Sequence, residues 1–325
     1  MNTAYLARVL IGLALVIGVS YVTPSWLNFL LVISAAKGIV ALGVVIAMRA
    51  GLVSFGQGLF FAAGAYTAGL MATRFGLSDF VVQTFLGTVV GLGIAALVGP
   101  LLSGYRGIFF ATLTLALSMI LYGALNKATL LGGSDGMTVP AATFFGYNPS
   151  GDMQTWLTFV GTAIASAVAW VWCDRIFRSR RGLMSLAVRE NELRVEYLGA
   201  SVKKVASANL RTAGALGGMG GAIAAMALSN INPDFSFWTT SGEFVFVAVL
   251  AGVRSIPAVF FASILLEVVK SFSSQYMPTA WQFVLGLFLF CVILFLPEGL
   301  GSLRDKFGRK TAAVVTEHTS TAVTK

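Results

Sequence analysis

The chain has 325 residues, of which 57% are hydrophobic and only 11% are charged, and its mean hydropathy is +0.84. Soluble domains carry about 25% charged residues, so this composition excludes a soluble globular protein and indicates a polytopic membrane protein. The formal net charge of +9 reflects how Lys and Arg are distributed among the loops, and it is no argument for nucleic-acid binding.

The apolar runs predict an all-α bundle, because a helix satisfies its own backbone hydrogen bonds within lipid. A transmembrane helix needs about 20 mostly apolar residues. Ten segments follow this pattern, at residues 5–23, 26–48, 57–73, 79–102, 107–126, 154–172, 205–228, 241–254, 257–272 and 280–297. The third, eighth and ninth are short. We interpret the first as a retained helix, because no small-residue cleavage site follows it.

The basic residues orient these segments. With both termini in the cytoplasm, the inside loops hold Arg49, Arg106, Arg254 and the polar segment 174–204, whereas the outside loops hold few basic residues. This agrees with the excess of Lys and Arg in the cytoplasmic loops of membrane proteins. We therefore expect a transmembrane domain over residues 1–298 and a disordered, cytoplasmic polar tail over residues 299–325.

Two glycine-rich stretches interrupt the apolar pattern. Gly51–Gly58 reads GLVSFGQG after the second segment, and Gly214–Gly221 reads GALGGMGG within the seventh. If the ten segments form two sets of five, these stretches fall at related places, and the two sets are an inverted repeat. Broken helices at matched positions favour a transport pathway, whereas Gly214–Gly221 and the Gly87–Gly91 pair are also typical of close helix packing.

The polar segment 174–204 contains a predicted short helix. Asn191 is a good N-cap for a helix over residues 192–198, and Gly199 supplies a left-handed stop. Glu190 and Arg194 have the spacing of a helical ion pair.

An apolar face is expected on that helix, because Leu193, Tyr197 and Leu198 would lie close together on one side. Such a face suits docking into the groove of another protein. The alternative is a solvated connector that sets the topology and binds nothing.

Ionisable residues inside the predicted spans are candidate functional groups. Lys37 lies in the middle of the second segment, Glu243 opens the eighth, and Glu267 and Lys270 lie three apart in the ninth. Lys37 is either a pathway residue or a lysine paired with carbonyl groups or facing a wet crevice. We interpret Glu267 and Lys270 as a pair on one helix face. The acids gather near the segment ends, which argues against proton coupling.

Known catalytic and cofactor-binding motifs are absent from the sequence, which lacks GxxxxGK[ST], HExxH and GxSxG. Cys173 and Cys291 form no CxxC pair, and the single histidine, His318, lies in the polar tail. We therefore expect neither an enzyme nor a chain that itself holds a metal or cofactor.

Several longer stretches are specific in combination. They are GLVSFGQGLFFAAGAYTAGL (51–70), YRGIFFATLTLALSMI (105–120), LLGGSDGMTVP (130–140), RENELRVEYLG (189–199), INPDFSF (231–237) and FLPEGL (295–300). With these stretches, which are spread over residues 51–300, the chain resembles the M-type permease subunit of bacterial branched-chain amino-acid ABC importers. That family has close relatives for urea and amides.

The resemblance implies an importer of the bacterial inner membrane. A periplasmic binding protein would deliver the solute, and a second, H-type permease would complete the pathway within the lipid. Two cytoplasmic ATPase subunits would bind ATP and magnesium and drive the switching of access. The resemblance places the ATPase-coupling surface at Arg189, Glu190, Asn191, Glu192, Leu193, Arg194, Glu196, Tyr197, Leu198 and Gly199.

Further site residues are expected in two other places. The translocation pathway is predicted at Ser54, Gly56, Gln57 and Gly58, together with Lys37. The ordered outside turn at Gly132, Gly133, Ser134 and Asp135 suits contact with the binding protein, and an unengaged turn is the alternative.

Two features depart from related importers. The broader coupling motif keeps only Gly199 and scattered acids, and Arg254 stands in AGVRSIP where the family commonly has glycine. The expected solute is a branched-chain amino acid. The alternatives are a urea or short-amide permease of the same architecture, an ATP-independent solute channel and an intramembrane enzyme.

Overall fold

The computed structural model describes residues 3–296 and 299–301. Its elements in chain order are α1 (Thr3–Ser20), α2 (Ser25–Met48), α3 (Gln57–Phe75), α4 (Phe80–Leu102), α5 (Gly107–Lys127), η1 (Thr129–Leu131), η2 (Gly133–Asp135), β1 (Met137–Thr138), α6 (Asp152–Arg178), α7 (Arg180–Glu190), α8 (Glu192–Tyr197), α9 (Val202–Leu228), β2 (Asn230–Ile231), η3 (Pro233–Ser236), α10 (Trp238–Ala251), α11 (Ile256–Tyr276) and α12 (Trp281–Phe295). The tail predicted over 299–325 lies outside the described residues beyond position 301.

The predicted all-α class is confirmed, and a helix overlaps each of the ten apolar segments: α1 to α6 and α9 to α12. Among the described residues, five helices are long and apolar enough to cross a membrane, namely α2, α4, α5, α6 and α11. The helices α10 and α12 are apolar but shorter. The polar segment 174–204 forms the end of α6, then α7 and α8, and then the start of α9.

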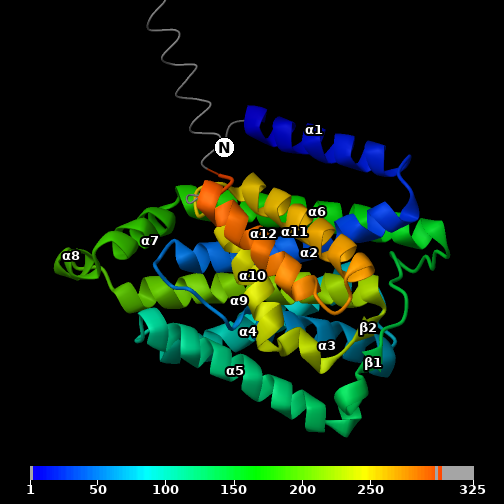
Figure 1. Cartoon of the computed structure of the whole chain (residues 1–325), viewed down its shortest axis with the longest axis horizontal. Coiled ribbons are helices and arrows are strands. Elements are labelled where there is room, and N and C mark those ends of the chain that lie inside the picture. The colour runs from blue at the N-terminus through cyan, green and yellow to red at the C-terminus, as the bar shows by residue number, and fades with distance from the viewer. Residues whose placement is uncertain (1–2, 297–298, 302–325) are drawn as a thin grey trace, which may run out of the picture.

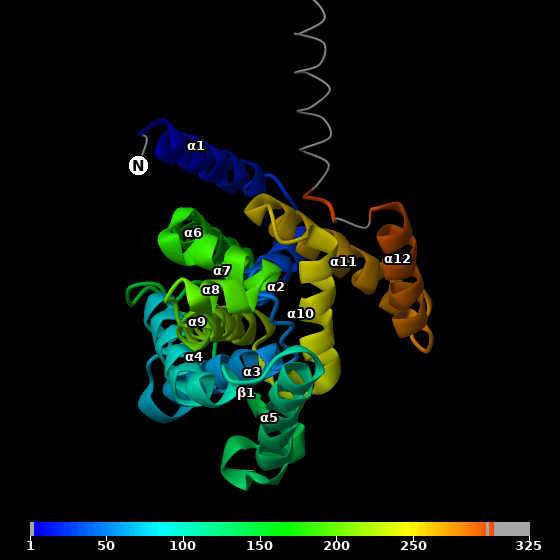
Figure 2. The same ribbon diagram turned by 90° about the vertical axis from the view of Figure 1, so that its left-hand side faces the viewer.

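Most helices lie side by side along the long axis of the molecule (Figure 1). The α7–α8 hairpin projects at one end, on the left in that view, and the β1–β2 pair lies at the other end. Viewed from the α7–α8 end, α2 and α9 lie in the middle of the bundle, with α3 and α4 on one side and α10 and α11 on another (Figure 2). The α2 and α9 helices therefore form the centre around which the remaining helices are arranged.

The expectation that Gly214–Gly221 interrupts its helix is wrong, because α9 runs unbroken from Val202 to Leu228. Its glycines instead allow backbone-to-backbone packing. A Cβ atom added at Gly64 would overlap the carbonyl of Gly218, and one at Gly91 would overlap the carbonyl of Gly214. We call this contact of α9 with α3 and α4 the glycine seam, and it confirms the close packing expected of such small residues.

Candidate functional site

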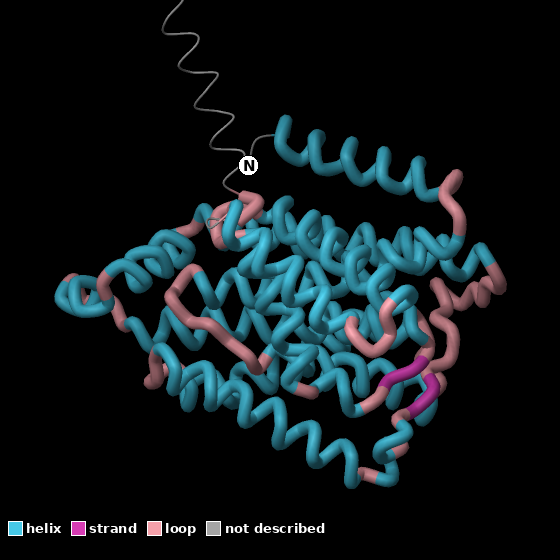
Figure 3. The backbone as a smooth tube through the Cα atoms, viewed as in Figure 1, coloured by secondary structure: helices cyan, strands magenta, loops and turns pink. Residues whose placement is uncertain are grey.

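The segment between α2 and α3 is not helical and is partly buried, with Gly51 and Val53 exposed. Gly51 has a φ of +75°, and the chain then forms neither helix nor strand until α3 begins at Gln57. Figure 3 shows this segment as a loop that runs from the end of α2 toward the middle of the bundle. Leu52 and Ser54 on it are fully buried. Irregular backbone at membrane depth is tolerated only where protein covers it or water lines it, and this segment meets that condition. The break predicted at Gly51–Gly58 is confirmed.

A second irregular segment precedes α10. After α9 ends, residues 229–237 pass through β2 and η3 before α10 begins at Trp238. The first turns of α3 and α10 meet, because the backbone N–H of Gly58 donates to Ser241 Oγ at 2.9 Å. A Cβ atom on Gly58 would lie 2.6 Å from that oxygen and 3.2 Å from the carbonyl of Phe235. An irregular segment that contains INPDFSF thus precedes α10, as residues 49–56 precede α3, whereas Gly214–Gly221 lies within α9.

Hydroxyl groups of α5 complete this meeting point. Thr114 Oγ1 accepts from the N–H of Phe55 at 3.2 Å, and Ser118 Oγ donates to the carbonyl of Ser236 at 2.8 Å. Thr114, Ser118, Ser236 and Ser241 are all buried. We call the meeting of α3, α5, η3 and α10 the polar junction and define it by Phe55, Gly56, Gly58, Thr114, Ser118, Ser236 and Ser241. Its neutral groups hydrogen bond to one another.

The predicted pathway residues fall partly at this junction. Gly56 and Gly58 belong to it, and Ser54 Oγ accepts from the N–H of Gly56 at 3.3 Å. The Gln57 side chain turns toward α2 and α9, where its Nε2 donates to the carbonyls of Val40 at 3.3 Å and Ala213 at 2.8 Å. Its Oε1 is buried and has no hydrogen-bond partner among the described residues. Gln57 therefore anchors the first turn of α3 to the centre of the bundle.

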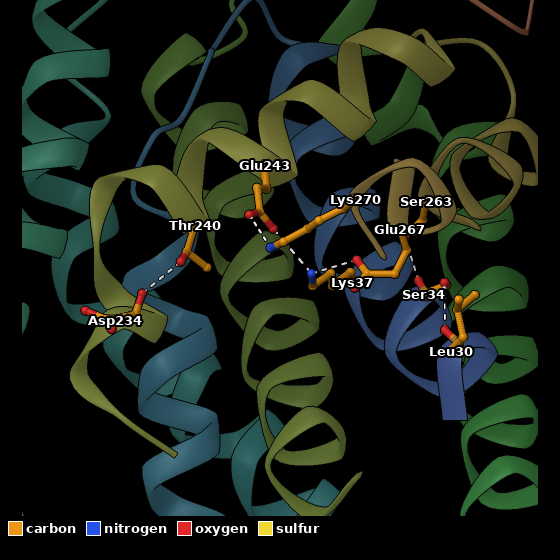
Figure 4. A network of polar contacts seen from close by, with 9 residues as sticks. All are labelled: Leu30, Ser34, Lys37, Asp234, Thr240, Glu243, Ser263, Glu267 and Lys270. Carbon is orange, nitrogen blue, oxygen red and sulfur yellow. Dashed lines mark hydrogen bonds and ion pairs between the residues drawn. The ribbon is translucent and has the colours of Figure 1, made fainter. Parts of the chain in front are cut away.

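Lys37, the fifth predicted pathway residue, lies in a cluster of four ionisable side chains (Figure 4). Its Nζ is 2.7 Å from Glu267 Oε2 and 3.3 Å from Glu243 Oε2. Lys270 Nζ lies 2.5 Å from the other carboxylate oxygen of Glu243 and 5.1 Å from the ring centre of Trp281. We call Lys37, Glu243, Glu267 and Lys270 the charge quartet. It joins α2, α10 and α11.

Two interpretations of these residues from the sequence are corrected. Glu267 and Lys270 were expected to pair with each other, but Glu267 binds Lys37 and Lys270 binds Glu243. The acids were expected to gather near segment ends, but folding brings both carboxylates against Lys37 in the interior. Lys37 is paired with carboxylates rather than with carbonyl groups. The sequence feature that indicates such pairing is the presence of acidic and basic residues in separate apolar segments.

The short helix predicted in the polar segment is confirmed as α8. Asn191 Oδ1 accepts from the N–H of Arg194 at 2.9 Å, and Gly199 has the left-handed φ of +83°. The apolar side chains Leu193, Tyr197 and Leu198 are 65%, 89% and 80% exposed. The described chain therefore leaves this face uncovered.

The ion pair expected between Glu190 and Arg194 assumed one continuous helix, but the two residues lie on different helices. Glu190 ends α7 and Arg194 belongs to α8, and Asn191 between them is extended with a φ of −159°. The spacing of four residues brings side chains together only on one continuous helix.

Glu192 on α8 instead pairs with Arg106, at 2.6 Å between Oε1 and Nε. Arg106 is the residue before α5, and it also donates to the carbonyls of Ser103 at 2.8 Å and Tyr105 at 2.7 Å. The α8 helix is thus tied to the start of the helix that carries Thr114 and Ser118. The sequence indicated that Arg106 lies in an inside loop, but it did not indicate the ion pair with Glu192.

The α7 helix is fixed to the bundle by Arg181. Its guanidinium donates to the carbonyl of Ala208, to Asn209 Oδ1 at 3.1 Å and to Thr212 Oγ1 at 2.7 Å. Asn209 Nδ2 in turn donates to Ser185 Oγ at 2.9 Å. Burial, and then the nearby Arg211, lower the pKa of the Arg181 guanidinium from its usual value. These bonds attach α7 to α9.

The predicted outside turn is ordered and lies at the opposite end of the bundle from α8 (Figure 1). It forms η1 and η2, and Gly132 and Gly133 both have positive φ. Ser134 Oγ donates to Asp135 Oδ1 at 3.2 Å, and both residues are exposed. The strand β1 that follows pairs antiparallel with β2, so this turn is connected to the segment that leads into η3.

The turn that contains Arg254 is contacted by Arg49, the residue that follows α2. Arg49 donates from Nη1 to the carbonyl of Val253 at 3.0 Å, and its guanidinium lies 4.0 Å from the ring centre of Phe177. The turn between α10 and α11 is therefore held from α2. Among the described residues, no group of three His, Cys, Asp or Glu side chains is arranged to hold a metal ion.

Comparison with known proteins identifies the family. Residues 26–294 match the family described as branched-chain amino acid transport system / permease component. The chain is 26% identical over 283 residues to the high-affinity branched-chain amino acid transport system permease protein LivM of Escherichia coli (strain K12), and equally to that of Salmonella typhimurium (strain LT2). Each alignment covers 80% of this chain and 65% of the relative. No solved structure matches the chain significantly.

The family match covers most of the chain, including every helix of the central bundle and both segments of the polar junction. It agrees with the resemblance found in the sequence and with a transport component rather than an enzyme. The chain spans 65% of the length of these relatives. This chain belongs to the branched-chain amino acid transport permease family and is a multi-pass membrane protein.

Proposed function

We propose that this chain is the membrane-spanning permease subunit of an ATP-driven importer for branched-chain or closely related amino acids. One observation supports this most directly. A capped helix with an uncovered apolar face, α8, stands at one end of the bundle, and an ordered glycine turn stands at the other. An importer needs both ends: a surface for a motor inside the cell and a surface for a solute-delivering protein outside.

The motor surface is α8 with its flanks, residues 189–199. Leu193, Tyr197 and Leu198 would enter a groove of a cytoplasmic ATPase subunit, as amphipathic helices do in other complexes. The energy source, ATP with magnesium, would be bound by two such subunits, and this chain would hold no cofactor. Movement of α8 would reach α5 through the Arg106–Glu192 pair and α9 through the Arg181 hydrogen bonds.

The pathway runs beside the polar junction. There the first turns of α3 and α10 meet the hydroxyl groups of α5, so neutral donors and acceptors lie deep in the bundle. Their hydrogen bonds can be exchanged for bonds to a passing solute at small net cost, since each contributes about 1 kcal/mol. A second, H-type permease would supply the opposite wall, and lipid would surround the pair.

The proposed topology has ten spans, with both termini in the cytoplasm of a bacterial inner membrane. The helices α1 to α5 form one set, and α6 with α9 to α12 forms the other, related as an inverted repeat. Supporting this, both α3 and α10 are the third apolar helix of their set, and both follow an irregular segment. Short spans such as α10 suit discontinuous helices that start inside the bundle.

The outside turn at Gly132–Asp135 is the proposed contact for the periplasmic binding protein. Ser134 and Asp135 are exposed there, and the pairing of β1 with β2 would carry a displacement of the turn to η3 and Ser236. The binding protein would supply most of the affinity for the solute.

Uptake of labelled leucine into vesicles that contain the complete complex tests the function. We expect ATP-dependent uptake that excess leucine suppresses and excess urea does not. Suppression by urea alone would assign the short-amide alternative. Uptake without ATP by the purified chain in liposomes would assign a channel, and turnover of lipid would assign an enzyme.

The coupling surface is tested by Leu193→Asp. Uptake should fall at least about tenfold while the spans stay folded, because a carboxylate would be buried in the ATPase groove. Leu183→Asp on α7 is the matched control, since Leu183 is also exposed. Equal losses in both variants would contradict the assignment to α8. Labelling of Tyr197→Cys by an impermeant maleimide from the periplasmic side would overturn the topology.

A further inference from the structure

The charge quartet stands out because it is not required by the packing of three apolar helices. Side-chain exposure is 14% for Lys37, 11% for Glu243 and 15% for Glu267, and it rises to 26% only for Lys270. Ionised groups are costly at such depth, and they persist where they are paired and have a function. Here two ammonium groups face two carboxylates, so the cluster carries no net formal charge.

The pairing pattern of the quartet is a chain rather than two separate pairs. Glu267 binds Lys37, Lys37 binds Glu243, and Glu243 binds Lys270 (Figure 4). Lys37 comes from α2, Glu243 from α10, and the other two from α11. A displacement of α10 away from α2 and α11 would therefore break the ion pairs on both carboxylate oxygens of Glu243 at once.

The quartet lies next to the polar junction along α10. Glu243 follows Ser241 by two residues on α10, and Ser241 accepts the hydrogen bond from Gly58. On the other side of the quartet, Ser263 Oγ of α11 donates to the carbonyl of Ser34 on α2 at 2.6 Å, which adds to the attachment of these helices. One side of α10 is thus held by charges, and its first turn contacts α3 through the neutral hydrogen bond from Gly58 to Ser241.

We propose that Lys37, Glu243, Glu267 and Lys270 are positioning residues of the pathway. They bind α10 and α11 to α2, which Gln57 joins to α3, and this attachment holds Ser241 against Gly58. This inference rests on the proposed function and deepens it. The four residues do not themselves need to touch the solute.

The expected loss of uptake on substituting each of the four residues follows from the number of opposite charges that it contacts. Lys37 and Glu243 each contact two opposite charges, whereas Glu267 and Lys270 each contact one. Glu243→Gln should lower uptake by more than about tenfold, because two ammonium groups would then share one carboxylate. Glu267→Gln should lower it only a few-fold. The conservative Glu243→Asp should recover part of the uptake, since it keeps the charge.

A labelling measurement separates positioning from general destabilisation. In a background with Cys173→Ala and Cys291→Ala, Ser241→Cys reports the polar junction and Ser263→Cys reports the α2–α11 contact. We expect Glu243→Gln to raise the reactivity of Ser241→Cys toward a small thiol reagent several-fold and to leave Ser263→Cys protected. Where Glu243→Gln does not fold, Glu267→Gln provides the same comparison with a smaller rise.

Two results would overturn the proposal: wild-type uptake in Glu243→Gln, or an equal rise in reactivity at both cysteines. Labelling requires no solute, so it is independent of the proposed function. If labelling behaves as expected but the wild-type complex imports no amino acid, the proposed function fails and the positioning role stands.

Discussion

The glycine seam and the polar junction are both built from glycine-rich sequence, and they differ in what meets the glycine. At the seam, Gly64 and Gly91 of α3 and α4 face glycine carbonyls of α9, so backbone packs against backbone. At the junction, Gly58 faces the hydroxyl of Ser241 and donates its N–H to it. The seam has one close-packed arrangement, whereas the junction can exchange one hydrogen-bond partner for another. We infer that the seam is scaffold and the junction is the part that changes.

The largest expected effect is at the seam. Gly64→Val would push methyl groups into the Gly218 backbone, and overpacking of this kind costs about 3 kcal/mol. We expect little folded protein, measured as the monodisperse fraction in detergent and by thermal unfolding. Gly93→Val is the control, because a Cβ there meets nothing within 4 Å in the described part of the chain. Normal folding of Gly64→Val would remove the distinction between the two regions.

At the polar junction we expect a smaller loss of folded protein than at the glycine seam, and the main effect there is on uptake. Ser241→Ala leaves the buried N–H of Gly58 without its acceptor, a loss of about 1–3 kcal/mol. Uptake should fall roughly tenfold while the monodisperse fraction stays near wild type. Ser274→Ala, an exposed serine bonded within its own helix, is the matched control. If Ser241→Ala instead fails to fold, the junction is scaffold like the seam.

The cap of α8 tests whether the proposed coupling surface must be preformed. Asn191→Ala removes the acceptor for the N–H of Arg194, which costs about 1 kcal/mol of helix stability. Uptake should decline a few-fold, and Asn191→Asp, which keeps a capping oxygen, should restore it. The readout is uptake together with ATPase stimulation by the loaded binding protein. A loss in both variants would point to a role of Asn191 other than capping.

The smallest effect is expected at the Arg106–Glu192 pair, because it is partly exposed and such pairs contribute about 0.2–1 kcal/mol. Arg106→Glu should reduce uptake about two- to threefold, and the exchange Arg106→Glu with Glu192→Arg should recover it. Recovery would connect α8 to α5 and thereby to the junction. If the exchange variant folds normally but its uptake does not recover, the connection from the α7–α8 hairpin to the bundle would instead run through the Arg181 hydrogen bonds to α9.

Local features were predictable because neighbouring residues create them. Asn191 caps α8 and Gly199 ends it, as expected from a capping side chain and a residue that tolerates positive φ. The break at Gly51–Gly58 was also foreseen. The break assigned to Gly214–Gly221 was wrong, because a glycine run has the same sequence signature whether it ends a helix or lies in a close helix contact. Only the partner helix distinguishes the two cases.

Hydropathy and local residue patterns alone indicate a helical membrane protein, the places of its apolar helices and the short capped helix in the polar segment. Lipid imposes these features on each segment separately, through hydropathy, capping and backbone hydrogen bonding. The tertiary structure alone decided that Lys37 meets Glu243 and Glu267, that Gly58 meets Ser241, and that Arg106 meets Glu192. Each of these contacts joins residues 86 or more positions apart, and such pairs come together only when whole helices pack.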